Sequence, residues 1–205
     1  MGRPREHDEH TREALRAAAE RLFDERGASG VSVRALADAV GTTTRAVYSL
    51  FGSRDGLLVD ALAQRAYELL EQGLDAQVET DDPARDVVEC GVGIFRPFVR
   101  EHPALFRITF QRVVPGFEPG QELIASRDSA FRRLCRKVGR APLGDKRVEV
   151  AALEFQALCE GLGNFELRGD ALRLLPSGQE DATWRSAFTS LVAGWGSPLV
   201  AGAQG

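Results

Sequence analysis

Apolar residues recur along most of the chain at the three- and four-residue spacing of an α-helix that faces a core. The first strong segment covers residues 11–26, and its core-facing positions are Leu15, Ala18, Ala19, Leu22 and Phe23. Alternating runs of apolar and polar residues rich in Val, Ile and Thr, which would indicate strands, do not recur. The pattern therefore predicts an all-α fold.

Two short helices are expected after Gly27, which ends the first helix. Ser32 and Thr43 stand where N-cap residues belong, and Gly41 and Gly52 stand at the two helix ends. On spacing alone, this is either a helix-turn-helix that fits a DNA major groove or a packed three-helix bundle. A connector helix capped by Ser53 is expected to run from there towards Leu70.

Longer helices are expected in the second part of the chain. Asp82 followed by Pro83 has the pattern of a helix start, and the helix it opens should extend to about Arg100 with a kink at Pro97. Further helices are expected over residues 103–110, 121–138, 145–167 and 180–195. Pro and Gly content predicts a loop over 114–120, a connection over 169–178 and a tail from 196.

The overall charge balance does not indicate a nucleic-acid partner. The chain of 205 residues has 26 basic and 30 acidic residues, a formal net charge of −4, and residues 1–57 hold nine of each. A DNA site must therefore come from placed residues and not from a general positive field. No apolar run approaches the roughly 18 residues of a membrane span and the start lacks a signal-peptide pattern, so a cytoplasmic protein is expected.

Signals for enzymes, metals and cofactors are weak. Cys90, Cys135 and Cys159 are odd in number and widely separated, which argues against a disulfide scaffold or a zinc site. The Gly91-Val92-Gly93 stretch lacks the third glycine of a dinucleotide loop and indicates close helix packing instead. The histidines, His7, His10 and His102, give no catalytic set. We therefore expect no enzymatic activity, no cofactor and no metal.

A family resemblance lies in the N-terminal part. It is carried by residues 14–23 and 31–37 and by the positions Gly27, Gly41, Thr43, Val47, Tyr48, Phe51, Ser53, Arg54, Asp55, Leu57 and Leu58. Together these residues resemble the N-terminal pattern of the tetracycline-repressor (TetR) family. The match runs without a gap. It implies a DNA-binding domain over residues 9–69 and an effector-binding and dimerisation domain over residues 70–205.

The resemblance implies a set of DNA contacts. Thr43 matches the hydroxyl at the start of the recognition helix, where the helix N-terminus favours a phosphate. Tyr48 matches a tyrosine that contacts the DNA backbone, and Arg54 stands where the family usually has a lysine that contacts phosphate. The full expected set is Arg34, Thr42, Thr43, Thr44, Arg45, Tyr48, Ser49 and Arg54.

Within this set, Thr44, Arg45 and Ser49 occupy the variable positions that face the bases. Arg45 is the best candidate for a bidentate contact with a guanine edge. One departure is Leu50, where the family often has an aromatic residue or histidine that touches phosphate. The basic start, residues 2–5, resembles an arm that reaches DNA, although short charged termini are more often only solvated.

The second domain resembles its family more weakly. Residues 102–110 are similar to a segment of the subset with a so-called WHG C-terminal domain, but Gln156 and Glu160 replace that subset's tryptophan and histidine. The family resemblance implies a small-molecule cavity, here for an apolar or aromatic effector. The expected lining is Phe95, Phe98, Phe106, Phe110, Phe131, Phe155, Glu160 and Asn164, although phenylalanines are usually buried for packing alone.

The last two helices are expected to form the interface of a homodimer. The interface residues expected there are Trp184, Phe188, Leu191, Val192 and Trp195, an apolar stripe at helical spacing. The predicted function is a dimeric repressor that an effector releases from a palindromic operator. The alternative is an effector-independent helical dimer that serves as an architectural or protein-interaction module.

Overall fold

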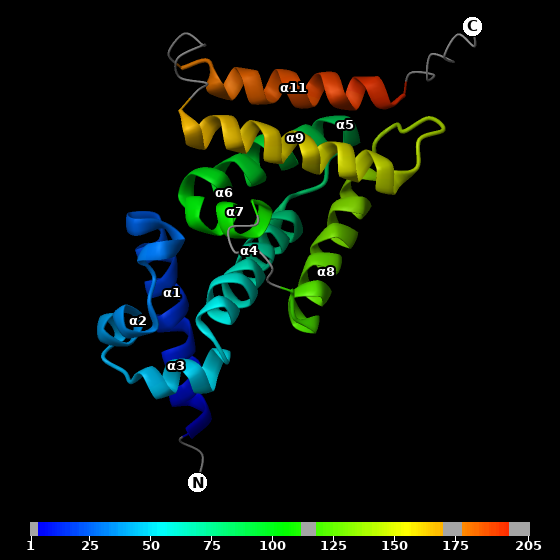
Figure 1. Ribbon diagram of the computed structural model, residues 1–205. Helices are drawn as coiled ribbons and strands as arrows, with labels where there is room; N and C mark the ends of the chain where they lie inside the picture. The colour runs from blue at the N-terminus through cyan, green and yellow to red at the C-terminus, as the bar shows by residue number, and fades with distance from the viewer. Residues whose placement is uncertain (1–3, 112–117, 170–177, 197–205) are drawn as a thin grey trace, which may run out of the picture. The chain divides into compact units, whose positions relative to one another are not determined.

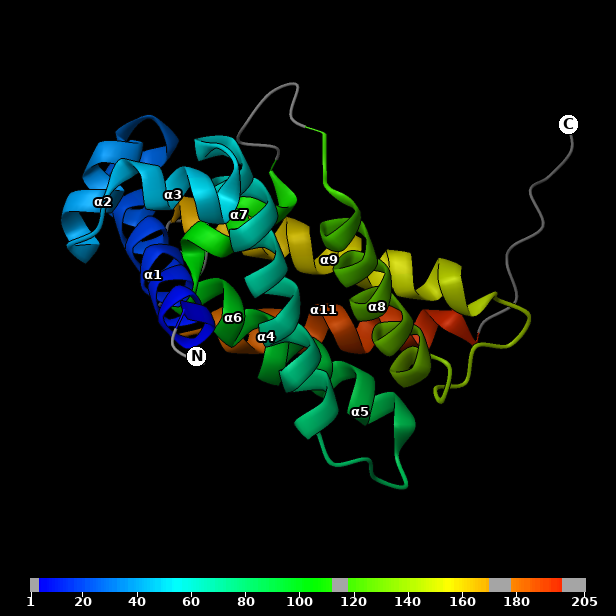
Figure 2. The same ribbon diagram turned by 90° about the horizontal axis from the view of Figure 1, so that it is seen from below.

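A computed structural model describes residues 4–111, 118–169 and 178–196 (Figures 1 and 2). Every regular element in these ranges is helical, as the sequence pattern predicts. The elements are α1 (Pro4–Gly30), α2 (Val33–Val40), α3 (Thr44–Phe51), the π-helical η1 (Gly56–Ala61), α4 (Leu62–Ala76), α5 (Pro83–Glu89), the π-helical η2 (Cys90–Phe95), α6 (Arg96–Glu101), α7 (Pro103–Phe110), α8 (Gln121–Val138), α9 (Val148–Arg168) and α11 (Glu180–Trp195). None of the described helices is long and apolar enough to cross a membrane.

Helix bounds follow the prediction where local signals are strong. Helices α7, α8 and α11 have the predicted limits. Helix α1 begins at Pro4 and not at Thr11, because its charged first turns carry no apolar pattern to detect. Helix α9 begins at Val148 and not at Asp145, because the amide of Lys146 donates to the carbonyl of Leu143 in a turn.

The helix predicted over residues 83–100 is interrupted. Asp82 caps its start by accepting a hydrogen bond from the amide of Arg85 at 3.0 Å, with Pro83 in the first turn. The π-helical η2 then precedes Pro97, the position of the predicted kink. Proline has no N–H to donate to the carbonyl four residues earlier, here that of Gly93. One backbone hydrogen bond of the helix is therefore missing where η2 ends.

Three predicted connections fall largely outside the described residues. These are most of the loop over 114–120, the connection over 170–177 and the tail from 197. The two described glycines beside the 170–177 connection have positive φ, 71° at Gly169 and 84° at Gly178. Gly169 ends α9 in the left-handed conformation that favours glycine.

The chain falls into two compact units. The first comprises the described residues within Met1–Leu69 and His102–Asp128, and the second those within Leu70–Glu101 and Ser129–Gly205. The first unit contains the segment predicted as the DNA-binding domain, residues 9–69, together with a later part of the chain. It also includes α7, which the sequence analysis gave to the second domain, because the apolar residues of α7 are buried in the first unit against α1 and η1.

The first unit is built around α1. The buried face of α1 consists of Leu15, Ala18, Ala19, Leu22 and Phe23, as predicted. Helices α2, α3 and α7 and the segment η1 pack on α1. Burying this much apolar surface is the main favourable term that holds three short helices in place, because helices of eight residues are marginal alone.

Polar pairs also join α7 to α1. Nδ1 of His102 lies 2.8 Å from Oε1 of Glu20, and a guanidinium nitrogen of Arg107 lies 4.0 Å from Oδ1 of Asp24. Burial and the neighbouring Glu20 raise the pKa of Asp24 above its ordinary value, although Arg107 lowers it in part. The contact between α1 and α7 is therefore both apolar and charged.

The second unit packs α11 against α5, η2 and α9. Figures 1 and 2 show α9 and α11 side by side and running in opposite directions. Gly91 is required where η2 approaches α11, because a Cβ there would lie 2.4 Å from a ring carbon of Phe188. This confirms the close packing predicted for the Gly91-Val92-Gly93 stretch. The ring of Phe188 also stacks on Phe155, with centroids 4.8 Å apart.

Buried charges tie the elements of the second unit together. Arg96, 8% exposed, donates from Nε to Glu166 at 3.0 Å and from Nη1 to Asp181 at 2.8 Å. Asp86, 5% exposed, accepts hydrogen bonds from the amide and hydroxyl of Thr80 and from Arg140. These pairs join residues between 6 and 85 positions apart, so they fix tertiary and not only local structure.

Candidate nucleic-acid interface and ligand-binding residues

Side-chain caps fix the two short helices in place. The hydroxyl of Ser32 accepts a hydrogen bond from the amide of Ala35, and that of Thr43 accepts one from the amide of Ala46, both at 3.1 Å. Gly41 ends α2 with φ at 71°, which lets the chain turn into α3 within three residues. The caps predicted from the sequence are confirmed. The two capped helices and the turn between them form a helix-turn-helix.

Helix α3 has two distinct faces. Val47 is fully buried and anchors the inner face against the core of the first unit. The outer face consists of exposed side chains, namely Thr43, Thr44, Arg45, Tyr48 and Ser49. These positions are adjacent or about one turn apart, so they share one side of the helix. Five of the eight predicted DNA-binding residues are therefore brought together on one exposed face.

The arginines around α3 differ in their surroundings. Arg45 is exposed, and within the described residues no carboxylate lies within 4 Å of its guanidinium. Arg34, on α2, is exposed but lies 4.0 Å from Asp38. The guanidinium of Arg45 on α3 is thus available to an incoming acceptor such as a base edge.

Arg12 is a structural residue that the sequence analysis did not single out. It donates from Nη1 to the carbonyl of Leu50 at 3.1 Å, and its guanidinium lies over the ring of Phe51, 5.3 Å from the centroid. It therefore holds the C-terminal end of α3 against α1. The cation of Arg12 stands beside the half-buried Leu50, where the TetR pattern often has an aromatic residue or histidine.

The remaining two predicted DNA-binding residues are less exposed. Thr42, in the turn, is half-buried. Arg54 is also half-buried, and its guanidinium points into the protein, where it donates to the carbonyls of Val31 and Ala28 and to Asp55. The sequence pattern placed Arg54 at the DNA because its position matches a family lysine, and such a match carries no information about side-chain direction.

The predicted effector residues are divided between the two units. Phe106 and Phe110 belong to the first unit, where Phe110 meets Tyr67 edge-on at 6.3 Å. The other predicted residues belong to the second unit, namely Phe95, Phe98, Phe131, Phe155, Glu160 and Asn164. Of the six phenylalanines, Phe95, Phe98, Phe106 and Phe155 are buried, and Phe110 and Phe131 are half-buried.

The polar residues of the predicted effector set contact each other along α9. Gln156 donates to the carboxylate of Glu160 at 2.8 Å, and Asn164 donates to the backbone carbonyl of Glu160, also at 2.8 Å. All three side chains are half-buried. The bond from Gln156 orients the carboxylate of Glu160 along its own helix, whereas the bond from Asn164 reaches only the backbone of Glu160.

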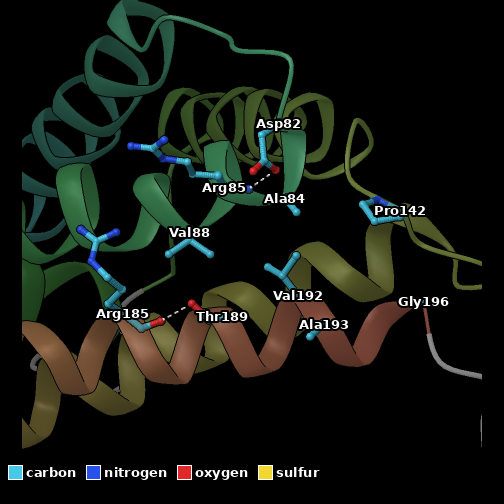
Figure 3. A pocket seen from close by; sticks show the side chains of 10 residues that line it. All are labelled: Asp82, Ala84, Arg85, Val88, Pro142, Arg185, Thr189, Val192, Ala193 and Gly196. Carbon is cyan, nitrogen blue, oxygen red and sulfur yellow. Dashed lines mark hydrogen bonds between the residues drawn. The ribbon is translucent and has the colours of Figure 1, made fainter.

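A groove of about 490 Å³ lies within the second unit, between α5 and α11 (Figure 3). Its volume is within the usual range for small-molecule sites. Val88 and Val192 lie in the middle of the groove, and Arg85 and Arg185 come from the two facing helices. Its other lining residues are Asp82, Ala84, Pro142, Thr189, Ala193 and Gly196, so none of the predicted effector residues lines it.

The predicted dimer stripe on α11 is mostly buried within the chain. Trp184, Phe188, Val192 and Trp195 are each at most 4% exposed, while Leu191 is half-buried. The indole nitrogen of Trp195 donates to Glu154 at 2.7 Å. Four of the five residues therefore pack against α5, η2 and α9 of the same chain, a role that helical spacing cannot distinguish from an intermolecular one.

Two of the three cysteines, Cys90 and Cys159, are buried. Burial raises the pKa of Cys90 to about 12 and that of Cys159 well above its ordinary value. Both thiols therefore stay protonated at neutral pH. Among the described residues, no group of three histidine, cysteine or acidic side chains is placed to hold a metal ion.

Comparisons with known proteins agree with this geometry. Residues 15–61 match the family model for bacterial regulatory proteins of the tetR family. A comparison with curated protein sequences finds no match.

Solved structures share the fold at low identity. A protein of unknown function from Rhodococcus sp. RHA1 is 23% identical, with a TM-score of 0.75, and the match covers 91% of this chain and 96% of that one. The TetR family transcriptional regulator PfmR from Thermus thermophilus is 21% identical, with a TM-score of 0.62 and coverage of 87% and 97%. A variant of TetR from Acinetobacter baumannii AYE, solved in complex with minocycline, is 22% identical, with a TM-score of 0.60 and coverage of 88% and 93%.

The family match falls on the segment that contains both short helices and all of the exposed face of α3. The structural matches extend the fold likeness over most of both chains. With its capped helix-turn-helix, the segment over residues 15–61 matches the tetR family of bacterial regulatory proteins, and the chain shares the fold of a solved TetR family transcriptional regulator.

Proposed function

We propose that the protein is a homodimeric repressor that binds a palindromic operator through the outer face of α3. The single observation that carries this proposal is the outer face itself, where Thr44, Arg45 and Tyr48 are exposed while the inner face is buried. A two-fold axis would present two such helices to successive major grooves.

Each exposed residue has a defined role in this proposal. Thr43 accepts from the amide of Ala46, so its hydroxyl hydrogen remains free to donate to a phosphate oxygen at the helix N-terminus. Tyr48, 52% exposed, donates its hydroxyl to the DNA backbone. Arg45 reads a guanine edge, and Thr44 and Ser49 face the neighbouring bases.

Selection from a random duplex library tests operator binding. The expected product is a palindrome whose half-sites are centred about 10 base pairs, or a multiple of that distance, apart. The double variant Arg45→Ala with Tyr48→Ala should lose the selected site. The matched control is Arg147→Ala, which removes an exposed arginine of the second unit. If the folded wild-type protein enriched no sequence, the proposal would fail in favour of the architectural module.

For the dimer, we propose that the exposed face of α9 contributes the contact together with Leu191 of α11. Three of the five large hydrophobic side chains that are exposed in the described residues lie on α9: Val150 at 44%, Leu153 at 58% and Phe165 at 47%. They follow helical spacing with exposed Ala157 and Gly161 between them. Small residues at such positions let two helices approach closely, and exposed apolar stripes mark association surfaces.

Sedimentation of charge variants tests this dimer. Leu153→Glu should convert the protein to a monomer because it would bury two unpaired carboxylates at an isologous contact. Val78→Glu is the control, because Val78 is 81% exposed but lies outside α9 and α11. A Leu153→Glu protein that stays dimeric would move the interface to another face.

We further propose that a small apolar or aromatic effector releases the operator. One protein of similar fold supports an effector, because the TetR variant from Acinetobacter baumannii AYE was solved in complex with minocycline. An effector must prefer the state that cannot bind DNA, and almost complete release requires about 5 kcal/mol of preference.

Two variants separate the possible effector sites. Phe131→Trp changes a half-buried member of the predicted set, while Ala193→Trp fills the groove between α5 and α11. In a screen of apolar and aromatic compounds, Phe131→Trp should weaken operator release and Ala193→Trp should leave it unchanged. The opposite result would assign the effector to the groove. If no compound released DNA, the regulator would act without such an effector.

A further inference from the structure

The side chain of Arg54 is held by the protein on three sides. Its Nε donates to the carbonyl of Val31 at 2.5 Å, its Nη2 donates to the carbonyl of Ala28, and its Nη1 lies 2.8 Å from Oδ1 of Asp55. The side chain is 33% exposed. All three nitrogen atoms of the guanidinium therefore already have acceptors inside the first unit.

One of the two carbonyls, that of Ala28, lies in the last turn of α1, and the other, that of Val31, lies between α1 and α2. Gly27 departs from helical geometry with φ at 67°, and Ser32 caps α2, so Ala28 and Val31 lie where one helix ends and the next begins. Carbonyls at a helix end have no partner within the helix. Arg54 supplies donors to both carbonyls at once, 26 and 23 positions away in sequence, and the carbonyl of Ala28 also accepts from the amide of Val31 at 3.4 Å.

The hydrogen bonds of Arg54 close a loop around the helix-turn-helix. Helices α2 and α3 both lie between Val31 and Arg54, so contact between these residues joins the two ends of the motif. The same segment leads directly into η1 at Gly56, where the amide of Gly56 donates to the hydroxyl of Ser53. The contact fixes how the motif is attached to both α1 and η1.

We propose that Arg54 is a positioning residue that holds the helix-turn-helix in its DNA-binding arrangement, and that it is not a phosphate contact. This inference rests on the proposed operator binding of α3. A motif whose two ends are fixed loses less conformational freedom when it binds, so the hydrogen bonds strengthen operator binding without touching DNA. A phosphate that accepted from the three N–H groups already bonded would have to displace the carbonyls of Val31 and Ala28 and the carboxylate of Asp55.

The variant Arg54→Lys distinguishes a positioning role from a phosphate contact. A phosphate contact needs a positive charge, which lysine keeps, whereas Arg54 bonds the two carbonyls from Nε and Nη2 of a planar guanidinium, and lysine lacks this pair of separated donor nitrogens. The positioning role therefore predicts that Arg54→Lys and Arg54→Ala behave alike. A phosphate contact predicts that Arg54→Lys resembles the wild type and that Arg54→Ala lowers the salt slope by about one unit.

The experiment combines operator titrations at several salt concentrations with hydrogen exchange of the free protein. We expect both variants to bind the operator about tenfold more weakly with an unchanged salt slope, and to exchange amides of residues 28–32 faster. Asp55→Asn, which keeps both carbonyl contacts, should show a smaller change in exchange. Hydrogen exchange tests the positioning role even if the protein binds no operator.

Two results would overturn the inference. One is an Arg54→Lys protein with wild-type operator affinity and wild-type exchange. The other is a decrease in the salt slope for Arg54→Ala alone, which would return Arg54 to the phosphate contacts. If Arg54→Ala did not fold, Arg54→Lys and Asp55→Asn would decide between the two roles.

Discussion

The caps of the helix-turn-helix and the buried charges of the second unit are contacts of different range. In the helix-turn-helix, Ser32, Thr43 and Ser53 each accept a hydrogen bond from an amide three residues further along. In the second unit, Arg96 reaches acidic side chains 70 and 85 residues away. Short-range contacts leave a signature in the sequence, whereas long-range contacts appear only when the chain is folded.

This difference decides which functional residues can be recognised. The outer face of α3 is exposed because a local cap and one buried valine, Val47, set the orientation of the helix. The apolar stripe on α11 could pack against helices of the same chain or against a second copy of the chain. Four of its five residues are buried within the same chain. The candidate DNA-binding face can thus be predicted from local sequence, whereas the proposed dimer and effector surfaces cannot.

Removing Arg96 should have the largest effect on stability. Arg96→Ala leaves Glu166, 16% exposed, without its closest cation in the second unit. Breaking a buried charge network in this way costs about 3 to 5 kcal/mol of the free energy of unfolding. Urea unfolding measures the loss, with Arg100→Ala as control because Arg100 is 63% exposed and 3.8 Å from the same carboxylate. A loss of less than about 1 kcal/mol would contradict the long-range account.

Acid should weaken the second unit through Asp86. Hydrogen bonds from Thr80, opposed by burial and supported by Arg140, hold the pKa of Asp86 below its ordinary value. A depressed pKa stabilises the fold above the ordinary aspartate value, and the contribution is lost as pH falls through the folded-state pKa. Urea unfolding from pH 7 down to pH 3 should show a smaller acid-induced loss for Asp86→Asn than for the wild type. Equal pH profiles would contradict this assignment.

The contribution of Asp24, in the first unit, to stability should change with pH in the opposite direction. Its pKa is raised, chiefly by burial and next by Glu20, so its contribution to stability is lost as pH rises through the folded-state pKa. Asp24→Asn should therefore stabilise the protein at pH 7 relative to the wild type. The same unfolding series measures this, and a destabilised Asp24→Asn protein would show that the Arg107 contact outweighs burial.

Loss of a single cap should have the smallest effect on stability. Ser32→Ala and Thr43→Ala should each cost about 1 kcal/mol, because each leaves one helix amide without its acceptor. Thr43→Ser keeps the acceptor and is the control. Thermal unfolding measures the change, and only the Thr43 variant should also weaken operator binding. Thermal stability unchanged in both alanine variants would contradict the local account of this motif.

Much of the fold could be predicted from the sequence. The limits of α8 and α11, the caps at Ser32 and Thr43, and the buried face of α1 all follow from local pattern. The interruption at η2 could not be predicted in detail. A proline indicates that the backbone hydrogen bonds of a helix are disturbed, but it does not indicate that the disturbed segment is π-helical.

The candidate sites were predictable to a smaller extent. The sequence placed Arg45 and Tyr48 on the exposed face of α3, where the structure has them. It could not give the direction of the Arg54 side chain or the role of Arg12, because both depend on carbonyls that only the folded chain brings near. The exposed apolar residues of α9, such as Leu153, also became visible only after packing had used the other face of that helix.

The most direct test of the central claim is the base preference of Arg45 variants on the selected operator. Arg45→Ala should cost about 1 to 3 kcal/mol and relax the preference at one position in each half-site. Arg45→Lys should relax the same position although it keeps the charge, because lysine lacks the bidentate fork. Operator affinity and base preference that stay at wild-type values in both variants would contradict the account of α3 as the recognition helix.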